Sequence, residues 1–203
     1  MMNFNSGWIE TICGPMFSGK TEELLRRVRR AQIARQKIQL FKPTLDDRYS
    51  EDHVTSHDAS KLPCFSVRRA HEIYDRLGDT TRVVGIDEIQ FLDESIVTVV
   101  EKLAYRGVRV ICAGLDLDYQ GVPFGVLPGL LAVSEKVTKL TAVCTICGME
   151  ASRSQRLMLT TDENDESQQQ ILVGGKESYE PRCRVHHEKN PEAVNLSFHI
   201  PPI

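Results

Sequence analysis

The sequence contains no long hydrophobic run and no surplus of positive charge. No apolar stretch approaches the roughly 20 residues that a membrane-spanning helix needs, and Met1 to Ser6 lack the charged and then apolar pattern of an export signal. Lysine and arginine number 25 against 28 aspartates and glutamates, so the formal net charge is −3. These features predict a cytoplasmic protein with no membrane partner, and they give no support to binding of nucleic acid.

The chain is also too short for two large domains, because 203 residues bury one full core and at most a small appended lobe. Its six cysteines are not expected to form disulfides in a reducing compartment. Cys13, Cys64 and Cys112 are expected to be ordinary thiols in or near the core. The spacing of the other three favours metal binding.

Strand-like and helix-like segments alternate through the first two thirds of the chain. Apolar runs predict strands at 8–13, 37–41, 82–87 and 108–113, and helical periodicity predicts helices at 20–36, 69–77 and 93–105. The polar segment 46–61 is interpreted as a functional loop. This alternation predicts an α/β fold, with a mostly parallel sheet flanked by helices and the active site at the carboxyl ends of the strands.

A phosphate-binding loop follows the first predicted strand. The segment fits G-x-x-x-x-G-K-[ST] and consists of Gly14, Pro15, Met16, Phe17, Ser18, Gly19, Lys20 and Thr21. Backbone amides of such a loop surround phosphates, the lysine reaches the β- and γ-phosphates, and the Thr21 hydroxyl is a magnesium ligand. The motif predicts a P-loop fold that binds ATP.

Two carboxylates end the predicted strand at 82–87. Asp87 occupies the position expected for a Walker-B aspartate, which acts through magnesium. Strand alternation directs Glu88 elsewhere, where it could accept a proton from an attacking hydroxyl or position water. A solvated acidic pair near the helix at 93–105 is the structural alternative.

Four potential metal ligands lie in two short motifs near the C-terminus. Cys144 and Cys147 form C-x-x-C, and Cys183 with His186 forms a second pair of the same spacing. Three thiolates and one imidazole predict a closed, structural zinc site. His187 is the competing fourth ligand, and a redox C-x-x-C is the alternative to a zinc site. The composition changes after Leu140, so we predict a nucleotide-binding domain at 1–140, a zinc-binding lid at 141–190 and a tail at 191–203.

Two further groups have weaker signals. Five arginines in the first predicted helix are expected to form a solvated face, although a phosphate or nucleic-acid surface is the alternative; they are Arg26, Arg27, Arg29, Arg30 and Arg35. Apolar side chains after predicted strand ends could form a slot for a nucleobase or belong to the core. They are Phe91, Leu115, Tyr119 and Phe124.

Three classes of function include proteins with a phosphate-binding loop or a zinc motif. A nucleic-acid-dependent P-loop ATPase needs a second lobe and a basic track, and the chain has neither the length nor the charge for them. A zinc-ribbon interaction module does not explain the phosphate-binding loop. A small-molecule kinase explains both the loop and the zinc motif.

From about Trp8 to His187, the chain resembles the type II, or cellular-type, thymidine kinases. Besides the phosphate-binding loop and the zinc motifs, the segments that carry the resemblance are Asp46-Asp47-Arg48-Tyr49, Asp87-Glu88-Ile89-Gln90-Phe91, Gly114-Leu115-Asp116, Pro123-Phe124-Gly125 and Gly174-Gly175-Lys176-Glu177-Ser178-Tyr179. Ser154 stands where some members of the family have threonine.

The resemblance implies transfer of the ATP γ-phosphate to the 5′-hydroxyl of thymidine, and of deoxyuridine, to give dTMP in nucleoside salvage. It implies that Glu88 accepts the proton and that Arg48, Ile89 and Gln90 belong to the ATP-binding set. The nucleoside pocket would include Met16, Phe91, Leu115, Tyr119 and Phe124. The lid would contact the thymine edge through Ile171, Leu172, Val173 and Gly174, anchored by Tyr179. A homotetramer inhibited by thymidine triphosphate is also implied.

Overall fold

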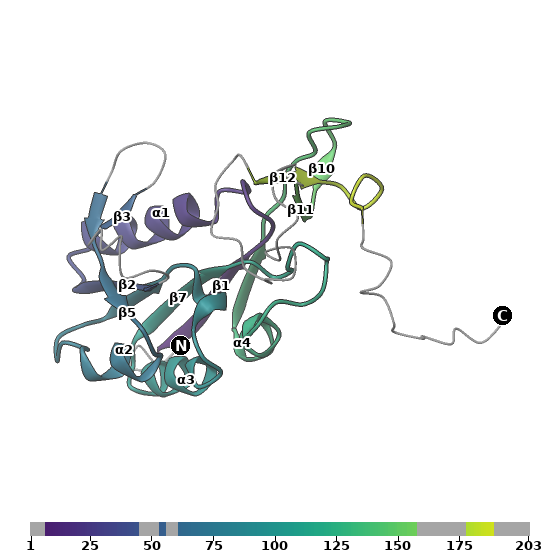
Figure 1. The fold of residues 1–203 in the computed structure, drawn as a ribbon. Helices are drawn as coiled ribbons and strands as arrows, with labels where there is room; N and C mark the ends of the chain where they lie inside the picture. Colours follow the sequence, from purple (N-terminus) through teal and green to yellow (C-terminus); the bar gives the residue numbers. More distant parts are fainter. Residues whose placement is uncertain (1–6, 45–52, 56–60, 158–177, 189–203) are drawn as a thin grey trace.

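The computed structural model describes residues 7–44, 53–55, 61–157 and 178–188 (Figure 1). Its centre is a six-stranded sheet in the order β5-β2-β6-β7-β1-β8, in which all paired strands are parallel. This architecture confirms the predicted α/β fold with a parallel sheet. The strands are β1 (Trp8–Cys13), β2 (Ile38–Pro43), β5 (Phe65–Val67), β6 (Val83–Ile86), β7 (Arg109–Gly114) and β8 (Lys136–Lys139).

Helices cover both faces of this sheet. One face carries α1 (Lys20–Ile33), whereas α2 (His71–Asp75), α3 (Ile96–Tyr105) and α4 (Leu127–Val133) lie on the other (Figure 1). Alternation along β1 explains the two layers, because Ile12 packs with Leu24 and Val28 of α1, while its neighbour Cys13 packs in the second core. None of the helices in these described ranges is long and apolar enough to cross a membrane.

Close packing of α1 on the sheet depends on Gly85, which has no side chain. A Cβ at Gly85 in β6 would lie 2.5 Å from Leu40 Cδ2 and 3.2 Å from Val28 Cγ2. Contacts that short would force α1 away from the sheet. Gly85 therefore sets the distance between α1 and the strand that delivers Asp87.

The remaining elements lie outside the central sheet. The hairpin of β3 (His53–Thr55) and β4 (Lys61–Pro63) occurs within and just after the segment interpreted as a loop. The C-terminal lobe contains two small antiparallel sheets, which pair β9 (Ala142–Val143) with β10 (Glu150–Ala151) and β11 (Arg153–Arg156) with β12 (Tyr179–Arg182). The lobe extends from one end of the sheet (Figure 1). The predicted domain boundary falls between β8 and β9.

The predicted solvated arginine face of α1 is wrong for Arg27. Arg26, Arg30 and Arg35 are exposed, but Arg27 is buried. Its guanidinium donates to Glu10 Oε2 at 2.7 Å and to Glu23 Oε1 at 2.8 Å. Glu10 is an inward-facing carboxylate on the apolar strand β1, and this buried charge requires a partner from the helix above it.

Candidate functional site

The phosphate-binding loop connects β1 to α1 as predicted. Gly14 has φ +142°, and a Cβ there would lie 2.4 Å from the carbonyl oxygen of Leu140, so no larger residue fits. Phe17 and Gly19 adopt left-handed conformations, with φ of 64° and 80°. Left-handed residues in such a turn allow backbone N–H groups to face one concave side, where an anion can bind.

Two side chains of the loop are held by one of its carbonyl groups. Lys20 Nζ donates to the carbonyl oxygen of Pro15 at 2.7 Å, and Ser18 Oγ donates to the same oxygen at 2.8 Å. Burial lowers the pKa of Lys20, although the carboxylates of Glu88 and Asp87 act in the opposite direction. The Lys20 amine is therefore fixed at the loop and next to the acidic end of β6.

Asp87 and Thr21 meet at the carboxyl edge of the sheet. Thr21 Oγ1 donates to Asp87 Oδ2 at 3.0 Å, across 66 residues of sequence. Burial raises the pKa of Asp87 to about 7, and the charge of Glu88 contributes to the increase. A hydroxyl and a carboxylate are hard oxygen ligands of the kind that Mg²⁺ prefers, so this pair fits the predicted magnesium site.

Glu88 lies beyond the end of β6, and its position does not follow from strand alternation. Its backbone is left-handed, with φ 49° and ψ 38°, at the start of the 3-10 helix η1 (Ile89–Phe91). The buried Gln90 donates from Nε2 to Glu88 Oε2 at 2.6 Å, and Gln90 Oε1 accepts from the backbone N–H of Leu115 at 3.1 Å. Gln90 thus fixes the Glu88 carboxylate relative to the end of β7.

The predicted nucleoside-pocket residues lie around the same edge. Phe91 and Phe124 form an edge-to-face aromatic pair with ring centroids 5.8 Å apart. Leu115 directly follows β7, and Tyr119 lies under the guanidinium of Arg156 at 5.4 Å. Arg156 in turn pairs with Tyr179 in the register of β11 and β12.

The C-terminal lobe contacts both the phosphate-binding loop and the loop after β7. Ser154 Oγ of β11 accepts from the backbone N–H of Met16 at 2.9 Å. On the other side, His187 Nε2 lies 2.8 Å from the carbonyl oxygen of Tyr119 and donates to it. The lobe is therefore joined by hydrogen bonds to two segments that carry predicted substrate-binding residues.

The four predicted zinc ligands come together in this lobe. Their ligand atoms all lie within 4.8 Å of one another. Cys147 Sγ is 3.8 Å from Cys183 Sγ, and His186 Nδ1 is 3.8 Å from Cys144 Sγ and 3.2 Å from Cys183 Sγ. Tetrahedral zinc places neighbouring sulfur and nitrogen ligands roughly 3.5–3.8 Å apart. The two separations of 3.8 Å match this spacing and that of 3.2 Å is somewhat shorter, so the four side chains are compatible with a Cys₃His site. His187 is engaged with Tyr119 instead.

Some predicted residues fall outside the described residues. They are Arg48 of the ATP-binding set and the lid segment Ile171, Leu172, Val173 and Gly174. Among the described residues, sequence reasoning missed three contacts near the candidate site, namely Met16 with Ser154, Tyr119 with His187, and the ion pair of 2.6 Å between Lys139 Nζ and Asp116 Oδ2. Each joins residues distant in sequence. The one available signal in the sequence was Asp116, an aspartate shortly after the predicted strand at 108–113.

The comparison with known families agrees with this geometry. A family model described as thymidine kinase matches residues 7–187, which is most of the chain.

Proposed function

The chain belongs to the thymidine kinase family, a family of enzymes that phosphorylate thymidine with ATP, and from this premise we propose that it transfers the γ-phosphate of ATP to the 5′-hydroxyl of thymidine to give dTMP. We propose deoxyuridine as a second acceptor. The observation that carries this proposal is the contact of Thr21 Oγ1 with Asp87 Oδ2 at 3.0 Å, with Glu88 fixed beside it by Gln90.

In the proposed reaction, the phosphate-binding loop holds ATP and Lys20 contacts its β- and γ-phosphates. Thr21 and Asp87 would hold magnesium, which neutralises charge on these phosphates. Glu88 accepts the proton of the 5′-hydroxyl as the hydroxyl oxygen forms its bond to the γ-phosphorus and ADP leaves. Lys20 lies close enough to both carboxylates for their charges to favour its protonated form. Positioning and charge neutralisation supply most of the acceleration in this type of reaction.

The nucleoside would lie against the aromatic pair of Phe91 and Phe124, near Leu115, Tyr119 and Met16. A thymine methyl group prefers such an apolar surface. The lobe, with structural zinc bound by Cys144, Cys147, Cys183 and His186, would support a lid anchored by Tyr179. A closed lid excludes water, so that thymidine rather than solvent receives the phosphoryl group. Arg48 and the segment 171–174 enter this proposal by resemblance alone.

Three further properties remain predictions: a homotetramer, feedback inhibition by thymidine triphosphate, and a cytoplasmic location. The oligomeric state can be measured by light scattering during size-exclusion chromatography.

The direct test is a phosphoryl-transfer assay with purified protein, ATP and magnesium across a panel of nucleosides. The proposal expects thymidine and deoxyuridine to be phosphorylated at the 5′ position, with little transfer to deoxycytidine or purine nucleosides. A separate reaction contains single-stranded DNA. ATP hydrolysis that is stimulated only by DNA would overturn the proposal in favour of a nucleic-acid-dependent ATPase.

A further inference from the structure

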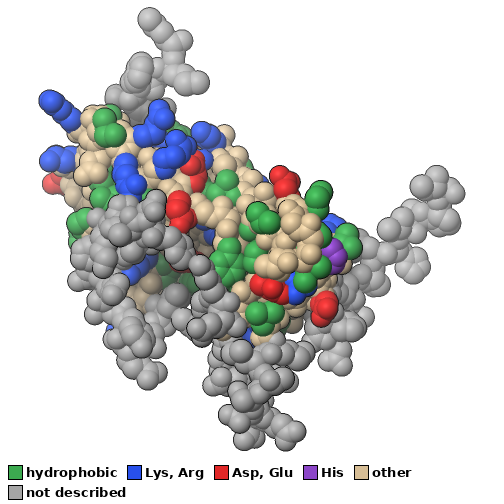
Figure 2. Space-filling view, turned by 90° about the horizontal axis from the view of Figure 1, so that it is seen from above, with side chains coloured by type: hydrophobic (Ala, Val, Ile, Leu, Met, Phe, Trp, Pro, Cys, Tyr) green, Lys and Arg blue, Asp and Glu red, His purple; other side chains and the backbone are tan. Residues whose placement is uncertain are grey.

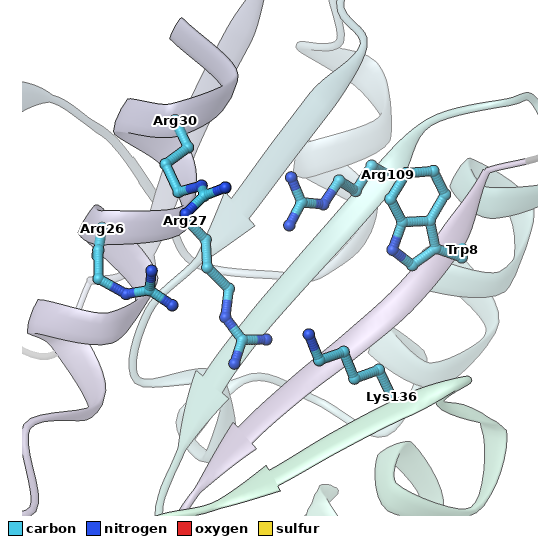
Figure 3. Close-up of a pocket in the computed structure, with 6 residues that line it drawn as sticks. All are labelled: Trp8, Arg26, Arg27, Arg30, Arg109 and Lys136. Atoms are coloured by element: carbon cyan, nitrogen blue, oxygen red, sulfur yellow. The ribbon is translucent and has the colours of Figure 1, made fainter. Parts of the chain in front are cut away.

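A basic pocket lies at the opposite end of the sheet from the phosphate-binding loop. Its volume is about 440 Å³, within the range of small-molecule sites. Three of its residues are the first of β1, β7 and β8, and the others come from one side of α1 (Figure 3). The lining consists of Trp8, Arg26, Arg27, Arg30, Arg109 and Lys136.

Part of this positive charge is neutralised within the protein. Glu10 accepts hydrogen bonds from Trp8 Nε1 at 2.8 Å, Arg27 NH1 at 2.7 Å and Arg109 Nε at 2.7 Å. Glu23 accepts from Arg26 and from Arg27. A third carboxylate, Glu135, accepts the backbone N–H of Ile9 at 2.7 Å. The presence of Arg27 and Arg109 in the pocket is therefore explained by their hydrogen bonds to the buried carboxylate of Glu10.

Arg30 and Lys136 are not explained in this way. Within the described residues, neither forms an ion pair or a side-chain hydrogen bond, and both are exposed at the pocket. Their side chains reach toward the centre from opposite walls, α1 and β8, and the Arg109 guanidinium turns toward the same space (Figure 3). Like charges that converge in this way repel one another, and an anion between them removes that repulsion.

The charge excess is local. The whole chain has a net charge of −3, yet Lys and Arg side chains gather toward one end of the surface on the α1 side (Figure 2). Arg26, Arg27 and Arg109 already pair with Glu23 and Glu10, so the uncompensated positive charge at the pocket comes from Arg30 and Lys136. Two converging cations suit a group with more than one negative charge, and a guanidinium group binds phosphate oxygens in pairs.

We propose that this pocket is a second anion site, which binds a di- or triphosphate group. The group could belong to a nucleotide or to inorganic polyphosphate. Trp8 is 41% exposed, and the Arg109 guanidinium lies over its ring at 5.4 Å, so a nucleobase could stack only on the part of the ring that Arg109 leaves uncovered. The site is separate from the phosphate-binding loop, since the six residues of β1 span roughly 20 Å. It does not depend on the proposed kinase reaction.

The chain itself provides a specific probe, because Trp8 is its only tryptophan. The experiment titrates inorganic tripolyphosphate and follows Trp8 fluorescence, with sodium chloride of equal ionic strength as the reference. The titration is repeated with Lys20→Ala, which removes the lysine of the phosphate-binding loop. It is repeated again with the double variant Arg30→Glu/Lys136→Glu and with Arg35→Glu, an exposed arginine of the same chain region outside the pocket.

A saturable fluorescence change is expected in the wild type, in Lys20→Ala and in Arg35→Glu. The affinity of the double variant should be at least about tenfold weaker, because two attractive charges become repulsive. The single variants Arg30→Gln and Lys136→Gln, which keep polar side chains, should have intermediate affinities. Circular dichroism and thermal unfolding report whether each variant is folded.

Three results would overturn the proposal: no saturable change, an unaltered affinity in the double variant, or a change that disappears in Lys20→Ala. The last would mean that Trp8 reports binding at the phosphate-binding loop. A parallel titration of Lys20→Ala with ATP separates the two sources of the phosphate group. Tighter binding of ATP than of tripolyphosphate identifies a nucleotide site, and equal binding identifies a polyphosphate site.

Discussion

At the scale of single residues, backbone strain is concentrated at the candidate active site. Only three non-glycine residues in the described ranges have positive φ, and two of them, Phe17 and Glu88, are in the phosphate-binding loop and at the end of β6. A left-handed conformation costs a non-glycine residue roughly 1–2 kcal/mol. Such strain persists where the surrounding contacts impose it, as Gln90 does for Glu88, and it is common at functional sites.

Replacing Glu88 with Gln should lower kcat by about 10²–10⁴-fold and leave ATP affinity almost unchanged. The amide cannot accept the hydroxyl proton, but the phosphate-binding loop is not altered. Steady-state kinetics and ATP binding by calorimetry measure the two effects. Glu94→Gln, at an exposed carboxylate six residues away, is the matched control. An equal loss of turnover and ATP affinity would contradict the role of Glu88 as base.

Glu88→Gly should inactivate the enzyme and yet stabilise the fold. Glycine adopts the left-handed conformation without a steric penalty, and removal of the carboxylate ends its repulsion of buried Asp87. A gain of about 1 kcal/mol would raise Tm by roughly 2–4 °C in a chain of this size. Calorimetry of the wild type and the variant measures it. A lower Tm would show that the hydrogen bond from Gln90 outweighs the strain.

At the scale of elements, the C-terminal lobe meets the rest of the molecule through specific hydrogen bonds. Ser154 of β11 holds the backbone of Met16, and His187 holds the carbonyl group of Tyr119 in the turn after β7. Asp118 Oδ1 closes that turn by accepting the backbone N–H groups of Gln120 and Val122, each at 2.9 Å. The position of the lobe is thereby coupled to the loop that carries Tyr119 and Phe124.

His187→Ala should therefore raise KM for thymidine severalfold, with little change in kcat and a normal zinc content. The variant removes the hydrogen bond to Tyr119 but retains all four predicted ligands, whereas Cys147→Ser should lose zinc as well as nucleoside affinity. Metal analysis and nucleoside kinetics on both variants test this difference. Loss of zinc in His187→Ala would assign His187 to the ligand set instead of His186.

At the scale of the whole molecule, the elements that could be predicted from the sequence are those whose formation depends on the local pattern of apolar residues. The strands at 8–13 and 108–113 match β1 and β7 closely because they are apolar and of ordinary length. Edge strand β8 was not predicted because its four residues are mostly polar and exposed. Strands β9 and β10 of the C-terminal lobe were not predicted because they have only two residues each. Their formation depends on neighbours that are distant in sequence.

The same distinction applies to the site. The phosphate-binding loop and the Cys₃His group follow from fixed spacing within short motifs. The Met16–Ser154 contact spans 138 residues, and the direction of Glu88 depends on a local left-handed turn, so neither could be derived from strand periodicity. Arg27 was misassigned for a similar reason, because its partner Glu10 lies on another element.

Glu10 also links sheet and helix across the whole fold, and its ionisation should affect global stability. Burial alone would raise its pKa, but hydrogen bonds from Arg109, Trp8 and Arg27, together with the charge of Arg109, outweigh burial and lower it. A carboxylate with a lowered pKa in the folded state stabilises the fold fully above its unfolded pKa, near 4.5. The contribution is lost as pH falls through the lower pKa of the folded state.

Glu10→Gln should thus destabilise the protein strongly at pH 7, by about 3–5 kcal/mol, because Arg27 and Arg109 lose a buried counter-charge. The difference from wild type should shrink as pH falls below about 4.5, because the carboxylate is then protonated in the unfolded state and, at still lower pH, in the folded state as well. Urea unfolding at pH 7, 4 and 3 follows this difference, and Glu22→Gln, at an exposed carboxylate of α1, is the control. A difference that stays constant with pH would show that Glu10 acts by packing and neutral hydrogen bonding, and its charge would then not be what holds α1 to β1 and β7.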